Sequence, residues 1–147
     1  MRFKDLEQSI RVASAAQFSF YLSVHFVHFN IIGPTFYSLH KLTDKIWHDA
    51  IEGFDGISEE IRALDLFAPA SLKDFFSLSP IPDMQEVDDA PVMVKRILEN
   101  AEILVKSLSE ANTLAEEHPG LQNFLQERID ITEKFAWMLR ATVQELV

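Results

Sequence analysis

Five side chains in this 147-residue sequence carry groups that bind metal ions, and their spacing assigns them to two consecutive helices. Imidazole and carboxylate groups in combination favour iron, manganese or zinc over metals that prefer soft ligands, and hard oxygen ligands mixed with imidazole suit iron. Taken singly, each group has an ordinary explanation, since a lone carboxylate is usually solvated and a lone histidine is usually a satisfied core residue. The candidates are His28 on an expected first helix, and His40, Asp44, Asp55 and Glu59 on an expected second helix.

The candidates on the second helix form two pairs. His40 and Asp44 are four residues apart, as are Asp55 and Glu59, so each pair projects from one helix face. Asp44 and Asp55, however, are eleven residues apart along the helix. At a rise of about 1.5 Å per residue this is about 16 Å, whereas metal–ligand bonds are only about 2.0–2.6 Å long. One chain therefore cannot bring both pairs to the same metal site.

The turn between the two helices sets the level of the first histidine. Gly33-Pro34 breaks the apolar pattern and predicts a tight turn. Antiparallel helices joined there have facing residues whose numbers sum to about 68. His28 and His40 satisfy this relation, so we expect them at the same level of the hairpin.

A two-fold copy of the second helix would bring the two pairs together. If the copies are antiparallel and centred between Asp49 and Ala50, residues face each other when their numbers sum to 99. His40 then meets Glu59 of the partner subunit, and Asp44 meets Asp55 of the partner subunit. An isologous dimer makes every such contact twice. The sequence therefore predicts two equivalent metal sites, each shared between two subunits.

Four long helices and one long connection are expected to position these groups. Apolar residues recur at helical spacing over 4–32, over 36–64, from about 88 or 89 to 111, and over 121–143. Three prolines prevent residues 65–85 from forming a single helix, but Ser71 and Asp74 resemble a capping box and predict a short helix there. His118-Pro119-Gly120 is expected to separate the last two helices. This pattern predicts a single all-α domain over 1–147, a ferritin-like four-helix bundle with a short extra helix in its crossover.

The first helix carries more apolar surface than one bundle covers. From residue 18 onward its outer faces are also apolar, and such a helix needs cover on more than one side. In a domain this small we expect the second cover to be another subunit. The residues concerned are Phe18, Tyr21, Leu22, Phe26 and Phe29.

The composition excludes several other classes of protein. There is no cysteine, so disulfide frameworks and thiolate metal sites are impossible. The sequence begins without a signal-peptide pattern, and its longest apolar-rich run, 18–32, is too short and too polar to span a membrane. We therefore expect a cytoplasmic protein. A formal charge of −10 repels phosphate backbones and attracts cations, so we expect no DNA binding.

Two segments resemble the ferroxidase signature of Dps proteins, the miniferritins: HFNIIGPTFYSLHKLTD at 28–44 and DGISEEIRAL at 55–64. The resemblance extends over nearly the whole chain, because the expected short helix in the crossover and the segment DITEKFAWML at 130–139 are also similar to that family.

This resemblance implies a hollow dodecamer with two irons at each inter-subunit ferroxidase site. It implies that Asp55 and Glu59 of one subunit, with His28 of the other, hold the tighter iron, while His40 and Asp44 assist a weaker second iron. It also implies oxidation of ferrous iron, usually by hydrogen peroxide, storage of the ferric mineral inside the shell, and protection against oxidative damage.

Three further side chains depart from the family pattern or remain open. Phe29 occupies a position where the family commonly has tryptophan, which removes one possible electron donor. His25 and His48 could be accessory metal ligands, although an interface hydrogen bond is the expected role. Two alternatives use the same fold: a DNA-compacting protein, which needs a basic tail or face that is missing here, and a structural or interaction particle with inactive metal sites.

Overall fold

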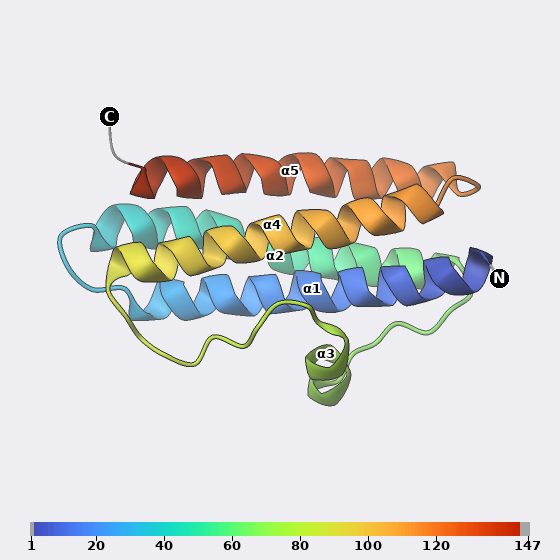
Figure 1. Cartoon of the computed structure of the whole chain (residues 1–147), viewed down its shortest axis with the longest axis horizontal. Helices are drawn as coiled ribbons and strands as arrows, with labels where there is room; N and C mark the ends of the chain where they lie inside the picture. The colour runs from blue at the N-terminus through green and yellow to red at the C-terminus, as the bar shows by residue number, and fades with distance from the viewer. Residues whose placement is uncertain (1, 145–147) are drawn as a thin grey trace.

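The computed structural model describes residues 2–144, in which four long helices form a bundle and a fifth, short helix lies outside it (Figure 1). This arrangement confirms the expected all-α, ferritin-like bundle with a short crossover helix. The elements are α1 (Arg2–Asn30), α2 (Phe36–Ala63), α3 (Leu72–Leu78), α4 (Ala90–Leu114) and α5 (Pro119–Val143).

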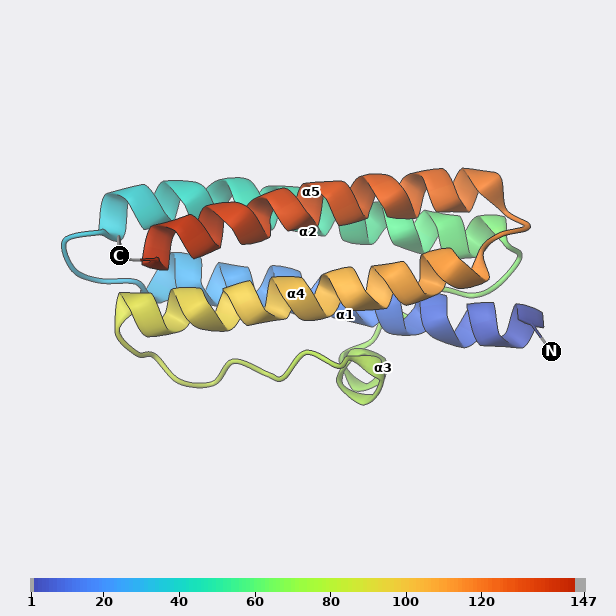
Figure 2. The same ribbon diagram turned by 45° about the horizontal axis from the view of Figure 1, so that its top comes forward.

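The long helices pair as two hairpins, α1 with α2 and α4 with α5 (Figure 2). The hairpins join through contacts of α1 with α4 and of α2 with α5. The crossover from α2 to α4 runs along the outside of α1 and carries α3, which lies across the bundle axis (Figure 1). The α1–α2 hairpin therefore positions all five metal-binding candidates.

The ends of α1 and α2 follow from local backbone preferences. In the turn between them, Gly33 has φ 110°, a left-handed conformation that favours glycine because it has no Cβ. After α2, Asp65 has φ 64°, which aspartate tolerates better than most residues. The expected boundaries of 4–32 and 36–64 are therefore confirmed to within two residues at each end.

The remaining helix starts show one confirmed prediction and one correction. At α3, the Oγ of Ser71 accepts a hydrogen bond from the backbone N–H of Asp74 at 3.2 Å, as the capping pattern predicted. At α5 the helix begins at Pro119, two residues before the expected 121, so of residues 118–120 only His118 lies between the helices. Proline fits the first helical turn because its missing N–H would have no acceptor within the helix.

The apolar stripes of the four long helices meet in one core. Gln17 of α1 is buried beside this core and donates from Nε2 to the carbonyl of Ala50 at 3.0 Å, which links α1 to the middle of α2. On α5 the buried face also includes polar side chains, because Arg128 and Thr132 are buried while the neighbouring Ile129 is only partly buried. None of the helices in the described residues is both long enough and apolar enough to cross a membrane.

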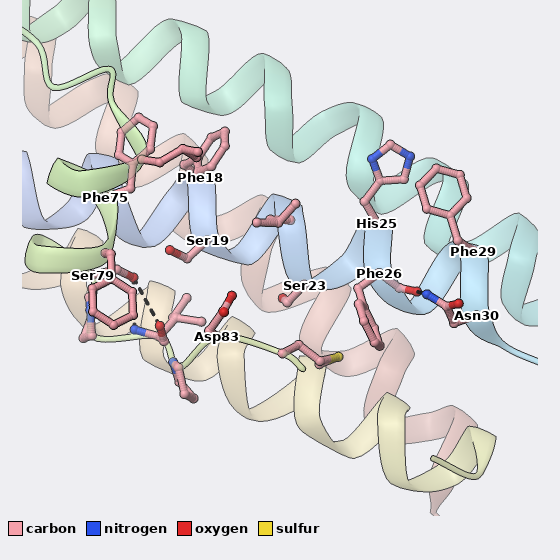
Figure 3. Close-up of a pocket in the computed structure, with 17 residues that line it drawn as sticks. Phe18, Ser19, Ser23, His25, Phe26, Phe29, Asn30, Phe75, Ser79 and Asp83 are labelled. Atoms are coloured by element: carbon pink, nitrogen blue, oxygen red, sulfur yellow. Dashed lines mark hydrogen bonds between the residues drawn. The ribbon is translucent and has the colours of Figure 1, made fainter. Parts of the chain in front are cut away.

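The outer face of α1 is covered only in part. Phe18 stacks on Phe75 of α3 with ring centroids 4.4 Å apart, so the chain's own crossover supplies cover that was expected from a second subunit. Beyond α3, Leu22 remains 45% exposed and Phe29 66% exposed. Both line a largely apolar groove of about 730 Å³ between α1 and the crossover (Figure 3).

Candidate metal centre

His28 on α1 and His40 on α2 lie against each other near the hairpin turn, as the residue numbers predicted. Their rings are stacked with centroids 3.8 Å apart. The Nδ1 of His28 lies 3.1 Å from the carbonyl oxygen of His40, and the Nδ1 of His40 lies 3.0 Å from the carbonyl oxygen of His28. A carbonyl oxygen can only accept, so each Nδ1 carries the proton. In each neutral ring the lone pair is therefore on Nε2, the form that binds a metal ion.

Thr43 adds a second partner that the sequence reasoning missed. Its hydroxyl donates to the carbonyl of Leu39 at 2.7 Å. The same hydroxyl oxygen lies 3.0 Å from the Nδ1 of His28 and can accept a hydrogen bond from the Nδ1–H. Thr43 is fully buried, so this contact is sheltered from water. Burial, followed by the nearby His40, lowers the pKa of His28. The low pKa favours the neutral imidazole that metal binding requires.

Asp44 completes the group near the turn. Its Oδ1 lies 3.9 Å from the Nε2 of His28, and its side chain is 53% exposed where that of His28 is 8% exposed. His48, one turn further along α2, donates from Nδ1 to the backbone carbonyl of Asp44 at 2.8 Å. Three of the five candidates, His28, His40 and Asp44, are therefore together, with a carboxylate open to solvent.

Asp55 and Glu59 form a second, separate group on α2. Both are exposed, whereas the neighbouring core residue Ile57 is buried. A hydrogen bond to Asp55 and the negative charge of Asp55 raise the pKa of Glu59. Two negative charges at once are therefore disfavoured in this pair. A divalent cation relieves such repulsion, so the pair is suited to cation binding.

The structure does not bring the two groups together within one chain. Among residues 2–144, no three imidazole or carboxylate groups are arranged to hold a metal ion. This agrees with the spacing of about 16 Å between Asp44 and Asp55 along a helix.

Aromatic rings from both α1 and α2 lie beside His28. The sequence analysis did not predict this arrangement. His25 stacks on Phe29 with centroids 4.2 Å apart and on Trp47 of α2 at 4.3 Å. Trp47 in turn stacks on His48 at 3.6 Å. Figure 3 shows His25 and Phe29 projecting from the same side of α1. Burial first, and then the proximity of His28, lowers the pKa of His25.

The sequence does contain a pattern that places Trp47 of α2 against α1. The numbers of Tyr21 and Trp47 also sum to 68, the relation that placed His28 opposite His40, and their ring centroids are 6.1 Å apart. The relation identifies facing positions but not ring orientations.

A buried ion pair holds α2 to α5 between the two groups of candidates. Arg128 of α5 donates to both carboxylate oxygens of Asp49, at 2.7 and 3.2 Å, and is only 7% exposed. Gly53 makes room for it, because a Cβ there would lie 2.6 Å from the guanidinium carbon. This two-pronged contact fixes the middle of α2 against the bundle.

Comparisons with known proteins agree with this fold. Residues 9–147 match the ferritin-like domain family. DNA protection during starvation protein 2 of Bacillus anthracis is 25% identical over 127 residues, covering 85% of this chain and 87% of that protein.

Two solved structures have nearly the same fold. Antigen TpF1 of Treponema pallidum superposes with a TM-score of 0.93 at 25% identity, covering 98% of this chain and 94% of the other. The Dps protein of Vibrio cholerae, described as a member of the ferritin-like diiron-carboxylate proteins, superposes with a TM-score of 0.91 at 23% identity, covering 97% and 91%.

Proposed function

Because this chain belongs to the Dps family of ferritin-like proteins, we propose that it is a ferroxidase and iron-storage protein whose sites are shared between two subunits. Ferrous iron is its substrate, hydrogen peroxide is the oxidant and the ferric product is kept inside a hollow homododecamer. The observation that carries the proposal is the division of the five candidate ligands. They form two groups on one hairpin, and the relation derived above pairs each group with the other across a two-fold axis.

The two groups contribute different chemistry to the proposed site. Asp55 and Glu59 supply negative charge that attracts and holds a ferrous ion. His28 of the partner subunit supplies a neutral imidazole whose Nε2 is free because its Nδ1–H is occupied by the carbonyl of His40. His40 and Asp44 assist a second, weaker ion. The protein fixes these positions and leaves the remaining coordination open to the oxidant.

Two ions at one site decide the products of the reaction. Two ferrous ions give one electron each to peroxide, which with two protons becomes two molecules of water. A single ferrous ion gives only one electron and releases a hydroxyl radical. The paired site therefore makes iron storage protective as well.

The shared site can be tested by combining two defective variants. One variant carries His40→Asn and Asp44→Asn, and the other carries Asp55→Asn and Glu59→Gln. Each assembly alone should oxidise iron poorly, because every one of its sites lacks ligands. In a mixed dimer, one of the two sites joins intact His40 and Asp44 from one variant to intact Asp55 and Glu59 from the other. Co-assembled variants should therefore regain part of the ferroxidase rate.

Two controls make the result decisive. Light scattering must show that each variant assembles, and affinity tags of two kinds must show that mixed dimers form. If mixed assemblies are proven and the rate stays at that of the separate variants, the site is not shared in the proposed way.

A further inference from the structure

Three buried polar atoms in the middle of the bundle have no hydrogen-bond partner among residues 2–144. They are the Oγ of Ser14, the Oε1 of Gln17 and the Nε of Arg128. All three side chains are buried alongside the apolar core. An unpaired polar atom in a protein interior costs free energy, so nearly all such atoms bond either to protein or to ordered water. The three atoms therefore point to a ligand inside the bundle.

Two of these side chains lie against one turn of α2. Arg128 of α5 lies over Gly53, where an added Cβ would be 2.7 Å from the Nε of the guanidinium. Gln17 of α1 donates from Nε2 to the carbonyl of Ala50 at 3.0 Å. Ala50 and Gly53 are three residues apart, so they are neighbours on one face of α2. Arg128 and Gln17 therefore border the same space from two different helices.

The register of the hairpin brings Ser14 to the same place. α1 and α2 run in opposite directions (Figure 1), and the bond from Gln17 to Ala50 fixes their relative level. Three residues back along α1 correspond to three residues forward along α2, so Ser14 lies at the level of Gly53. Ser14 is fully buried, so its hydroxyl lies inside the bundle rather than in solvent. The unpaired atoms of Ser14, Gln17 and Arg128 therefore border one region beside Gly53.

The three atoms have complementary hydrogen-bonding roles. The Nε–H of Arg128 can only donate, the Oε1 of Gln17 can only accept, and the hydroxyl of Ser14 can do either. Asp49 already binds the two terminal nitrogens of Arg128, at 3.2 and 2.7 Å, and neutralises its charge. A small neutral molecule therefore suits the region better than an ion. Water can accept from Arg128, donate to Gln17 and bond to Ser14, and about three hydrogen bonds are typical of a buried water.

From this arrangement we propose that the junction of α1, α2 and α5 binds one ordered water molecule, which bridges Ser14, Gln17 and Arg128. α1 and α5 lie diagonally across the bundle and do not pack against each other over the described residues. The water joins these two helices and completes the hydrogen bonding of the guanidinium that holds Asp49. It needs neither iron nor a second subunit, so the proposal stands or fails separately from the proposed function.

A crystal structure of the unchanged, iron-free protein tests the site directly, at a resolution that reveals ordered waters. One oxygen should lie within about 2.7–3.2 Å of all three atoms. It should be present at room temperature as well as at cryogenic temperature. A direct bond from the Nε of Arg128 to the Oε1 of Gln17 would overturn the proposal, as would a junction closed by side chains with no water between them.

Two substitutions of similar size at Ser14 test what the water does. The amide of Ser14→Asn can take the place of the water, accepting from Arg128 and donating to Gln17, whereas Ser14→Leu fills the space with carbon. Both should remove the water, but Ser14→Leu should have the lower urea midpoint, because it leaves both partners unpaired. Helix propensity alone predicts the reverse order, since leucine favours helices more than asparagine. An equal or higher midpoint for Ser14→Leu would therefore refute the bridging role.

Smaller substitutions keep the test possible if Ser14→Leu does not assemble. In Ser14→Ala the water should remain on Arg128 and Gln17, and adding Gln17→Met should remove it. A water that persists in this double variant would be held by other groups, which would contradict the assignment. Ser23 is the matched control, because it is a buried serine of α1 whose hydroxyl donates to the carbonyl of Phe20 at 2.8 Å. Ser23→Ala should leave the water and its three bonds unchanged.

Discussion

His28 and His40 hold each other in place, since the Nδ1–H of each ring is donated to the backbone carbonyl of the other residue at 3.1 and 3.0 Å. This reciprocal contact crosses from α1 to α2 just before the turn at Gly33. The contact fastens α1 to α2 at the turn end of the hairpin, and it leaves both Nε2 atoms free. Stability and metal binding at this position can therefore be separated by substitution.

Two substitutions of His40 should make that separation. The side-chain amide of His40→Asn can replace the Nδ1–H donor but not the Nε2 ligand, while His40→Ala loses both. Both variants should bind Co²⁺, an ion that stands in for ferrous iron and does not react with oxygen, roughly tenfold or more weakly. His40→Ala alone should also lose about 1 kcal/mol of stability per subunit. Calorimetric titration and urea unfolding at equal subunit concentration measure the two effects. Equal loss of stability in both variants would contradict the reciprocal contact.

Removing a charge from the exposed pair of Asp55 and Glu59 should weaken metal binding, whereas removing a charge beside the pair should not. Glu59→Gln removes a proposed ligand, and Glu60→Gln removes the same charge from the adjacent residue. Co²⁺ affinity should fall by about tenfold or more in the first variant and remain nearly unchanged in the second. Neither should lower the unfolding midpoint, because Glu59 is exposed and already repelled by Asp55. Equal affinity losses would indicate a general effect of surface charge.

Breaking the partly buried ion pair should be costly. Arg128→Met leaves the carboxylate of Asp49 without its partner and should destabilise the fold by about 3 kcal/mol, the low end for a buried pair, because the Asp49 side chain is 26% exposed and keeps some contact with water. Arg96→Met is the matched control, because its ion pair with Asp88 is more exposed, at 34% and 41%, and should matter by about 1 kcal/mol or less. Adding Asp49→Leu to Arg128→Met should restore part of the loss. Chemical unfolding of the four proteins tests the series, and similar losses for Arg128→Met and Arg96→Met would refute the expected difference.

The exposed apolar surface of α1 should be an assembly surface. Light scattering at micromolar concentration and neutral pH should give a mass near that of twelve chains. Leu22→Glu places a charge in the groove beside α1, at a residue that is 45% exposed in the single chain, and should yield smaller species with unchanged helical content. A mass near that of one chain for the unchanged protein would refute the expected assembly.

The protein should not bind duplex DNA at physiological salt unless divalent cations bridge the two. Each chain carries a formal charge of −10, and DNA binding is driven by cationic contacts that displace counterions from the phosphates. Gel-shift assays with chelator present should show free DNA at all salt concentrations. A shift that weakens as salt rises would reveal a cationic surface that the sequence does not suggest.

The helices and the hairpin register could be predicted because they depend on patterns along the chain. Apolar spacing identified the four long helices, and Ser71 with Asp74 identified α3. The facing relation across the turn placed His28 beside His40. The start of α5 was expected two residues too late, because proline breaks helices in general but is tolerated in the first turn, where Pro119 lies.

The remaining features depend on pairs of side chains distant in sequence. Arg128 is buried only because Asp49 neutralises it and Gly53 leaves space for it, and no pattern on α5 alone records that. The stacking of Trp47 between His25 and His48 depends on ring orientations, which residue spacing does not specify. The partial cover of Phe18 by α3 depends on the path of the crossover.

The buried pair between Asp49 and Arg128 also has a consequence for how such a protein can diverge. Every proposed ligand, and the whole ring stack, lies on the α1–α2 hairpin, so the chemistry is inherited as one continuous segment. The α4–α5 hairpin can accept substitutions that remodel the outside or the lumen of a shell without altering that segment. Arg128 is the exception, because a change there disturbs the midpoint of α2, from which the two groups of ligands extend in opposite directions. Outside the shared apolar core, drift in the second half of the chain is therefore constrained at this contact, where a loss on α5 would require a compensating change on α2.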